Sequence, residues 1–125
     1  MILDTNAVSA LFSGDEALAR RLSGHDPLHL PVIVIGEYRY GLLRSRHRKS
    51  VAQLLETLIA ESIVLTVDAD TAKAYAAIRD ELRQRGTPIP ENDLWIAALA
   101  RQHELPVVTR DTRFDLVWRL DRASW

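Results

Sequence analysis

The sequence predicts an α/β fold, a three-layer α/β/α sandwich with a central parallel sheet. Short apolar runs that suit buried strands alternate along the chain with longer segments of helical periodicity. This alternation is typical of a parallel sheet that is covered by helices on both faces. The chain has 125 residues and shows no internal repeat, low-complexity tract or linker. We therefore expect a single domain over residues 1–125.

The first segment should be a buried strand followed by two short helices. Residues 2–3 are apolar and lead into Asp4, after which Thr5 or Asn6 can cap a helix that continues through residues 7–12. A Ser-Gly-Asp run ends this helix. The next helix is expected over residues 16–22 and ends at a Ser-Gly pair.

A second strand and two further helices should follow. Residues 28–30 precede a proline, which favours extended backbone. From residue 32 to 43, apolar side chains recur at three- and four-residue spacing, which predicts a helix that carries Glu37 among them. The same spacing recurs over residues 51–59 and predicts another amphipathic helix.

The second half of the chain should add two or three strands and two long helices. Residues 63–67 are rich in β-branched side chains and predict a strand. Asp68 can cap the long helix that follows, and Gly86 can end it. Residues 92–103 form an almost wholly apolar helix that we expect to be buried on most sides. A buried strand is expected at 106–109 and a last strand between 118 and 125.

Composition excludes several classes of site. The chain has no cysteine, so disulfides and thiolate metal sites are excluded and a metal would need oxygen or imidazole ligands. The four histidines (His25, His29, His47 and His103) have no metal-ligand spacing. The first residues do not read as a signal peptide, and no apolar run approaches the roughly 20 residues that span a bilayer. We expect a cytoplasmic protein with no membrane role.

The basic residues allow two interpretations. Net charge is −1, but the chain uses 14 Arg against 2 Lys, and one segment after Tyr38 is basic and free of acids: Arg39, Arg44, Arg46, His47, Arg48 and Lys49. These side chains suit a solvated helix end, where the helix dipole favours cations. They would equally suit contact with a nucleic-acid backbone. Trp95 and Trp118 are expected to pack in the core.

Four acids occur beside the apolar elements. Asp4 follows the first strand, Asp93 begins the most apolar helix, and Asp111 follows the strand at 106–109. In a parallel sheet these positions meet at the carboxyl edge, where ligands bind. Glu37 joins them if its helix starts there, although Arg39 or Arg44 could pair with it instead. Taken singly, each Asp could be a helix cap or a turn residue.

Together the four acids point to a metal site. Converging carboxylates repel one another, and a divalent cation removes that repulsion. Mg²⁺ binds a few carboxylates and completes its shell with waters and phosphate oxygens. Such an ion activates water and stabilises charge on phosphorus, which is the chemistry of phosphodiester hydrolysis.

The chain resembles PIN-domain ribonucleases, and VapC toxins in particular. Four motifs carry the resemblance over nearly the whole length: Ile-Leu-Asp-Thr-Asn at 2–6, Val-Ile-Gly-Glu-Tyr-Arg-Tyr-Gly-Leu at 34–42, Asn-Asp-Leu-Trp-Ile-Ala-Ala at 92–98 and Val-Val-Thr-Arg-Asp at 107–111. The resemblance implies an acidic site of Asp4, Glu37, Asp93 and Asp111. In it Asp4 and Asp93 would bind Mg²⁺ or Mn²⁺, with support from Thr5, Asn6 and Thr109.

The resemblance also implies a role and partners. It implies a toxin that cleaves RNA, forms a homodimer and is silenced by a cognate VapB-like antitoxin. Asp115 could replace Asp111 as the fourth acid; we prefer Asp111 because it follows the strand at once. Arg39, Arg44, Arg46 and Arg48 would hold the RNA backbone. Two alternatives stay open: a PIN-fold binding module without catalysis that partners a DNA-binding antitoxin, and a nuclease that acts on DNA.

Overall fold

The computed structural model describes residues 1–25 and 27–125. Within them, a five-stranded sheet has the order β3-β2-β1-β4-β5, and every neighbouring pair is parallel. The strands are β1 (Ile2–Leu3), β2 (His29–Pro31), β3 (Ile63–Leu65), β4 (Val107–Val108) and β5 (Arg122–Ala123). The parallel sheet that the sequence predicted is confirmed.

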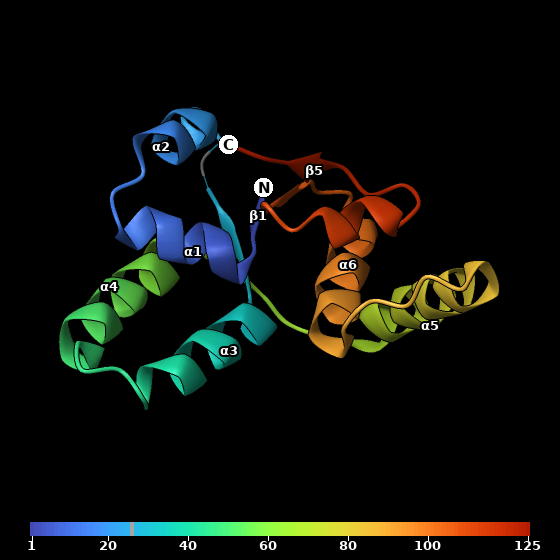
Figure 1. The fold of residues 1–125 in the computed structure, drawn as a ribbon, viewed down its shortest axis with the longest axis horizontal. Helices are drawn as coiled ribbons and strands as arrows, with labels where there is room; N and C mark the ends of the chain where they lie inside the picture. The colour runs from blue at the N-terminus through green and yellow to red at the C-terminus, as the bar shows by residue number, and fades with distance from the viewer. Residues whose placement is uncertain (26) are drawn as a thin grey trace.

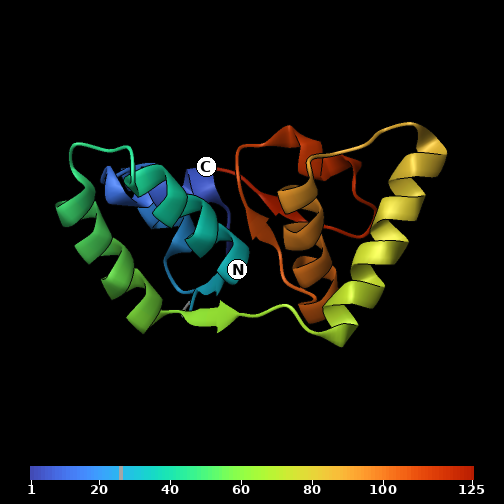
Figure 2. The same ribbon diagram turned by 90° about the horizontal axis from the view of Figure 1, so that it is seen from below.

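Helices cover the sheet from both sides, as Figures 1 and 2 show. One group gathers on one side of the strands: α1 (Thr5–Phe12), α2 (Glu16–Leu22), α3 (Val32–Leu42) and α4 (Arg48–Glu61). The other side carries α5 (Ala69–Arg85) and α6 (Glu91–His103), which pack along each other. The predicted α/β/α arrangement is therefore confirmed. Among the described residues, no helix is both long and apolar enough to cross a bilayer.

Side chains at the predicted boundaries fix the helix ends. Asp68 and Thr71 form a capping box at the start of α5, in which each side chain accepts a 3.0 Å hydrogen bond from the other residue's backbone N–H. Gly86 ends α5 with a φ of 69°, a left-handed conformation that glycine adopts without strain. Asp4 caps α1 in place of the predicted Thr5 or Asn6, because Thr5 is already helical; a cap was the alternative role considered for Asp4. The chain enters α1 directly from the end of β1, which leaves no residue between strand and cap.

Helix α6 forms the centre of one layer. Most of its apolar side chains are buried, as predicted: Leu94, Ile96, Ala97, Ala98, Leu99 and Ala100. Strands β1 and β4 are fully buried between the two layers. The core thus holds the amino end of α6 against the carboxyl ends of β1 and β4.

The structure differs from the sequence-based expectation for one tryptophan and for the segment near the C-terminus. Trp118 is 60% exposed, so its predicted place in the core was wrong. Trp95 is half-buried and stacks on Tyr75, with ring centroids 4.0 Å apart. A 3₁₀ helix, η1 (Thr112–Leu116), which the sequence did not predict, precedes the short strand β5. Its Phe114 fills the core in place of Trp118.

Candidate active site

The register of β1 and β4 brings Asp4 beside Thr109. Leu3 pairs with Val108, and the Asp4 N–H donates a 3.2 Å hydrogen bond to the Val108 carbonyl. The residue after each strand therefore lies at the same edge of the sheet. Asp4 is 5% exposed and Thr109 is fully buried, so this is a polar pair inside the protein.

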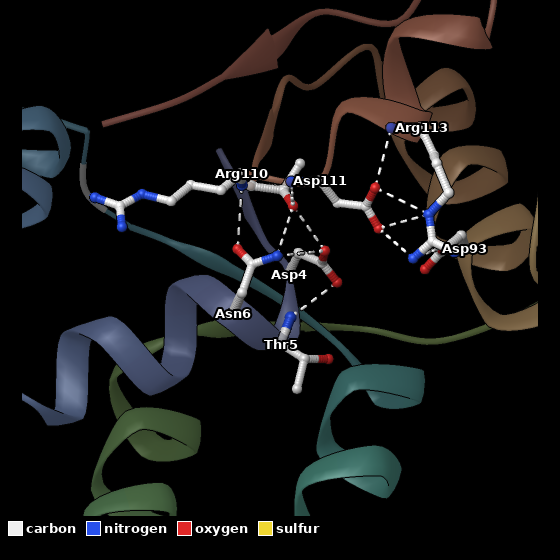
Figure 3. Close-up of polar contacts among 8 residues, drawn as sticks. Asp4, Thr5, Asn6, Asp93, Arg110, Asp111 and Arg113 are labelled. Carbon is white, nitrogen blue, oxygen red and sulfur yellow. Dashed lines mark hydrogen bonds and ion pairs between the residues drawn. The ribbon is translucent and has the colours of Figure 1, made fainter.

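A hydrogen-bond network holds the Asp4 carboxylate (Figure 3). Its Oδ1 accepts from the Thr5 N–H at 2.8 Å, and its Oδ2 accepts from the Thr109 hydroxyl at 2.8 Å. Asn6 Nδ2 donates to Oδ2 of Asp4 at 3.4 Å and to the Thr109 hydroxyl at 3.0 Å. The structure thus brings together the three residues expected to support Asp4. Thr5 contributes its backbone, while its buried hydroxyl oxygen lacks a hydrogen-bond partner.

Asp93 reaches the same edge from the first turn of α6. One oxygen, Oδ2, is buried and has no hydrogen-bond partner. The pKa of Asp93 is raised to about 6, first by burial and then by the negative charges of Asp4, Asp111 and Glu37, with Arg113 acting in the opposite direction. The charges of the other three acids thus act on Asp93 in the direction that favours its protonated form.

Glu37 completes the group from the second turn of α3, which begins directly after β2. The residue is half-buried, and its Oε1 is buried without a hydrogen-bond partner. Burial raises the pKa of Glu37, the charge of Asp4 raises it further, and a hydrogen bond with Asn92 lowers it. Neither basic residue that was considered as its partner binds it: Arg39 pairs with Glu56 at 2.6 Å, and the Arg44 guanidinium lies over the Tyr40 ring.

Asp111 lies with the other acids, and Asp115 does not. The Asp111 N–H donates to the Thr109 hydroxyl at 3.0 Å, and Asp111 acts on the pKa of both Asp4 and Asp93. Asp115 instead pairs with Arg122 through two hydrogen bonds of 2.8 and 3.0 Å on the surface. The preference for Asp111 over Asp115 agrees with this geometry.

Arg113 was not singled out from the sequence. Its guanidinium binds Asp111 and lies 3.7 Å from Oδ2 of Asp93 (Figure 3). These contacts and a backbone hydrogen bond lower the pKa of Asp111, with the Arg113 side chain the largest cause. Arg113 follows Asp111 by two residues, and nothing in the sequence distinguishes it from the other arginines. These contacts of Arg113 depend on the turn of η1, which no sequence pattern predicted.

The chemistry of these side chains suits a hard divalent cation. They offer carboxylate oxygens, two of them buried without a hydrogen-bond partner, and Mg²⁺ and Mn²⁺ prefer such ligands. Within residues 1–25 and 27–125, no three His, Cys, Asp or Glu side chains already form a closed set of ligands. Mg²⁺ does not need such a set, because it commonly keeps one or two carboxylates and takes waters and phosphate oxygens for the rest.

A groove passes Glu37 and reaches the turn between α3 and α4. It has a volume of about 340 Å³ and runs along α1 and α3, lined by Thr5, Ser9, Glu37, Tyr38, Gly41, Leu42, Ser45 and Val51. Arg44, Arg46 and Arg48 are exposed around this turn, whose Ser45 lines the groove. Arg39 is also exposed, beside this turn on α3.

Comparison with known proteins gives one family. The family model described as PIN domain matches residues 1–119. The chain is 38% identical to ribonuclease VapC5 of Mycobacterium tuberculosis over 118 residues, which cover 90% of this chain and 84% of that protein.

Two solved structures share the fold. VapBC from Salmonella typhimurium, solved bound to DNA, matches with a TM-score of 0.89 and 27% identity, over 99% of this chain and 96% of the matched chain. VapBC2 from Rickettsia felis, bound to a DNA fragment from their promoter, matches with a TM-score of 0.90 and 24% identity, over 99% and 97% of the two chains.

Proposed function

We propose that this chain, which belongs to the PIN-domain family, is a Mg²⁺- or Mn²⁺-dependent endoribonuclease and the toxin of a type II toxin–antitoxin pair. One observation carries the proposal: Asp4, Glu37, Asp93 and Asp111 converge at the carboxyl edge of the sheet, and one oxygen of Glu37 and one of Asp93 are buried without a hydrogen-bond partner. Such a group is unfavourable without a cation. Its energetic cost is understandable if a metal is bound during the reaction.

The four acids divide into two roles in this proposal. Asp4 and Asp93 would hold the metal, and Glu37 or Asp111 would orient or deprotonate the attacking water. When bound, the ion would lower the pKa of a water and stabilise the charge that develops on phosphorus. Thr5, Asn6 and Thr109 would support this arrangement by fixing the Asp4 carboxylate, which all three contact through backbone or side chain.

The groove along α3 provides a path for the RNA backbone. Arg39, Arg44, Arg46 and Arg48 would contact phosphates beyond its far end. The Arg39–Glu56 ion pair does not prevent this, because both side chains are at least half exposed and such pairs contribute little. Replacing these arginines should weaken RNA binding and reduce its dependence on salt concentration.

The related structures suggest the protein partner. Both contain VapBC, so we propose that this chain pairs with a VapB-like antitoxin. We further propose that it forms a homodimer and acts on RNA in the cytoplasm.

A cleavage assay with paired substrates tests this function. Purified protein is incubated with an RNA and with a DNA of the same sequence, in Mg²⁺, Mn²⁺ or EDTA. We expect cleavage of the RNA alone, and only with metal. Cleavage of the DNA alone would identify a DNA-directed nuclease. A folded protein that binds no metal at millimolar concentration, measured by calorimetry, would instead be a binding module.

A further inference from the structure

Arg113 is the basic residue that faces the acids. Its Nε and Nη2 donate to both oxygens of Asp111 at 2.6–3.1 Å, and Nη2 lies 3.7 Å from Oδ2 of Asp93. Among the described residues, no other Lys, Arg or His comes within ion-pair distance of Asp4, Glu37, Asp93 or Asp111. The cluster therefore has one positive charge, and this charge lies on the side of Asp93 and Asp111.

The position of Arg113 is set by local structure. Asp111 caps η1, and the Arg113 N–H donates to Oδ1 of Asp111 at 3.0 Å. The same carboxylate therefore binds the backbone and the side chain of Arg113. Even so, the side chain is 54% exposed. Asp111 holds the guanidinium through Nε and Nη2, and solvent reaches the side chain. A guanidinium held in this way can bind a further anion.

Arg110 provides a natural comparison. It lies on the other side of Asp111 in the sequence, but its side chain points away from the acids (Figure 3). The Arg110 guanidinium lies 3.8 Å from Asp15 and stacks on the Trp125 ring at 4.5 Å. Of the two arginines that flank Asp111 in the sequence, only Arg113 is directed at the acidic cluster.

We infer that Arg113 is a catalytic residue: its guanidinium provides a positive charge, in addition to the divalent ion, that binds the RNA phosphate under attack. This inference rests on the proposed nuclease function. Its contact with Asp93 is longer than a hydrogen bond, so part of the guanidinium is available to another acceptor. A planar guanidinium matches two phosphate oxygens and stabilises charge that develops on them. Asp111 would then orient Arg113 as well as complete the acidic group.

Replacing Arg113 should change metal binding and RNA cleavage in opposite directions. In Arg113→Gln, Mn²⁺ should bind several-fold more tightly, because a positive charge beside the metal ligands is gone. RNA cleavage should nevertheless fall on the order of 10²-fold, the loss expected when one donor to the developing charge is removed. Arg113→Lys keeps the charge without the planar fork and should recover part of the cleavage. Arg110→Gln, the matched control, should behave as the wild type in both measurements.

Calorimetric titration with Mn²⁺ and single-turnover cleavage give the two values, and circular dichroism checks that each variant is folded. Weaker metal binding by both Arg113 variants would overturn the inference, since Arg113 would then only hold Asp93 and Asp111 in place. Cleavage by Arg113→Gln at the wild-type rate would also overturn it, while leaving the nuclease function intact. A wild-type protein that never cleaves RNA would overturn both proposals.

Discussion

The hydroxyl of Thr109 donates a 2.8 Å hydrogen bond to Oδ2 of Asp4, and so joins the ends of β4 and β1 inside the protein. The same oxygen atom of Thr109 accepts from Asn6 Nδ2 and from the Asp111 N–H, each at 3.0 Å. One buried hydroxyl thereby connects Asp4, Asn6 and Asp111. Two of the four acids are therefore positioned in part by this one side chain.

Replacing Thr109 by valine should destabilise the protein. The change preserves shape but leaves the Asn6 amide, the Asp111 N–H and one Asp4 oxygen without this partner. We expect the free energy of unfolding to fall by about 1–3 kcal/mol, the usual cost of unsatisfied buried polar groups. Denaturant unfolding measures it. Thr109→Ser is the control, because it keeps the hydroxyl and should therefore keep these hydrogen bonds; a valine variant as stable as the wild type would show that the hydrogen bonds make no net contribution to stability.

Asp111 and Asp115 should respond differently to the same substitution. Asp111→Asn should lower metal-dependent RNA cleavage by roughly 10²–10⁴-fold, the range for removal of a positioned base. Asp115→Asn breaks only its surface pair with Arg122, so it should keep the activity and change stability by less than about 1 kcal/mol. Cleavage rates of the two purified variants decide the matter. A larger loss of RNA cleavage in Asp115→Asn than in Asp111→Asn would make Asp115 the fourth acid of the site.

The metal-free protein should lose stability as the pH rises through the titration of Asp93. The pKa of Asp93 is about 6 in the folded chain and 3.8 when unperturbed. Between about pH 4 and 6 the folded chain keeps a proton that the unfolded chain releases, so stability falls with rising pH, by on the order of 2–3 kcal/mol for this group. Asp93→Asn has no titrating group at this position, so its free energy of unfolding should not show this fall.

Thermal unfolding in EDTA should therefore show Asp93→Asn to be several degrees more stable than the wild type at pH 8. The difference should shrink as the pH approaches 4, because both side chains are then neutral. A difference that does not vary with pH would mean that burial and neighbouring charge do not perturb this carboxyl.

Metal should stabilise the wild type and not the Asp93 variant. A ligand at 100 times its dissociation constant adds about 2.7 kcal/mol to the stability of the folded state. We expect Mn²⁺ to raise the melting temperature of the wild type at pH 8, EDTA to reverse the rise, and Asp93→Asn to show little change. An equal rise in both proteins would place the metal away from Asp93.

Much of this architecture could be predicted, because local signals coincide with the fold. Apolar runs of two to three residues beside Asp4 and Thr109 predicted the strands, and the cap at Asp68 predicted the start of α5. The carboxyl edge of a parallel sheet then brought Asp4, Asp93 and Asp111 together without knowledge of any contact.

Other features depend on tertiary structure that no local pattern records. Phe114 takes the core position expected for Trp118 because η1 turns the chain, and a five-residue 3₁₀ helix leaves little trace in sequence periodicity. Arg113 faces the acids and Arg110 does not for the same reason.

The most direct test of the account is cleavage of total cellular RNA by purified, antitoxin-free protein with Mg²⁺ or Mn²⁺ and with EDTA, beside Asp93→Ala. The account predicts discrete RNA fragments that require both the metal and Asp93. Intact RNA under every metal condition, from a protein shown to be folded, would contradict it, and so would fragments that Asp93→Ala produces at the wild-type rate.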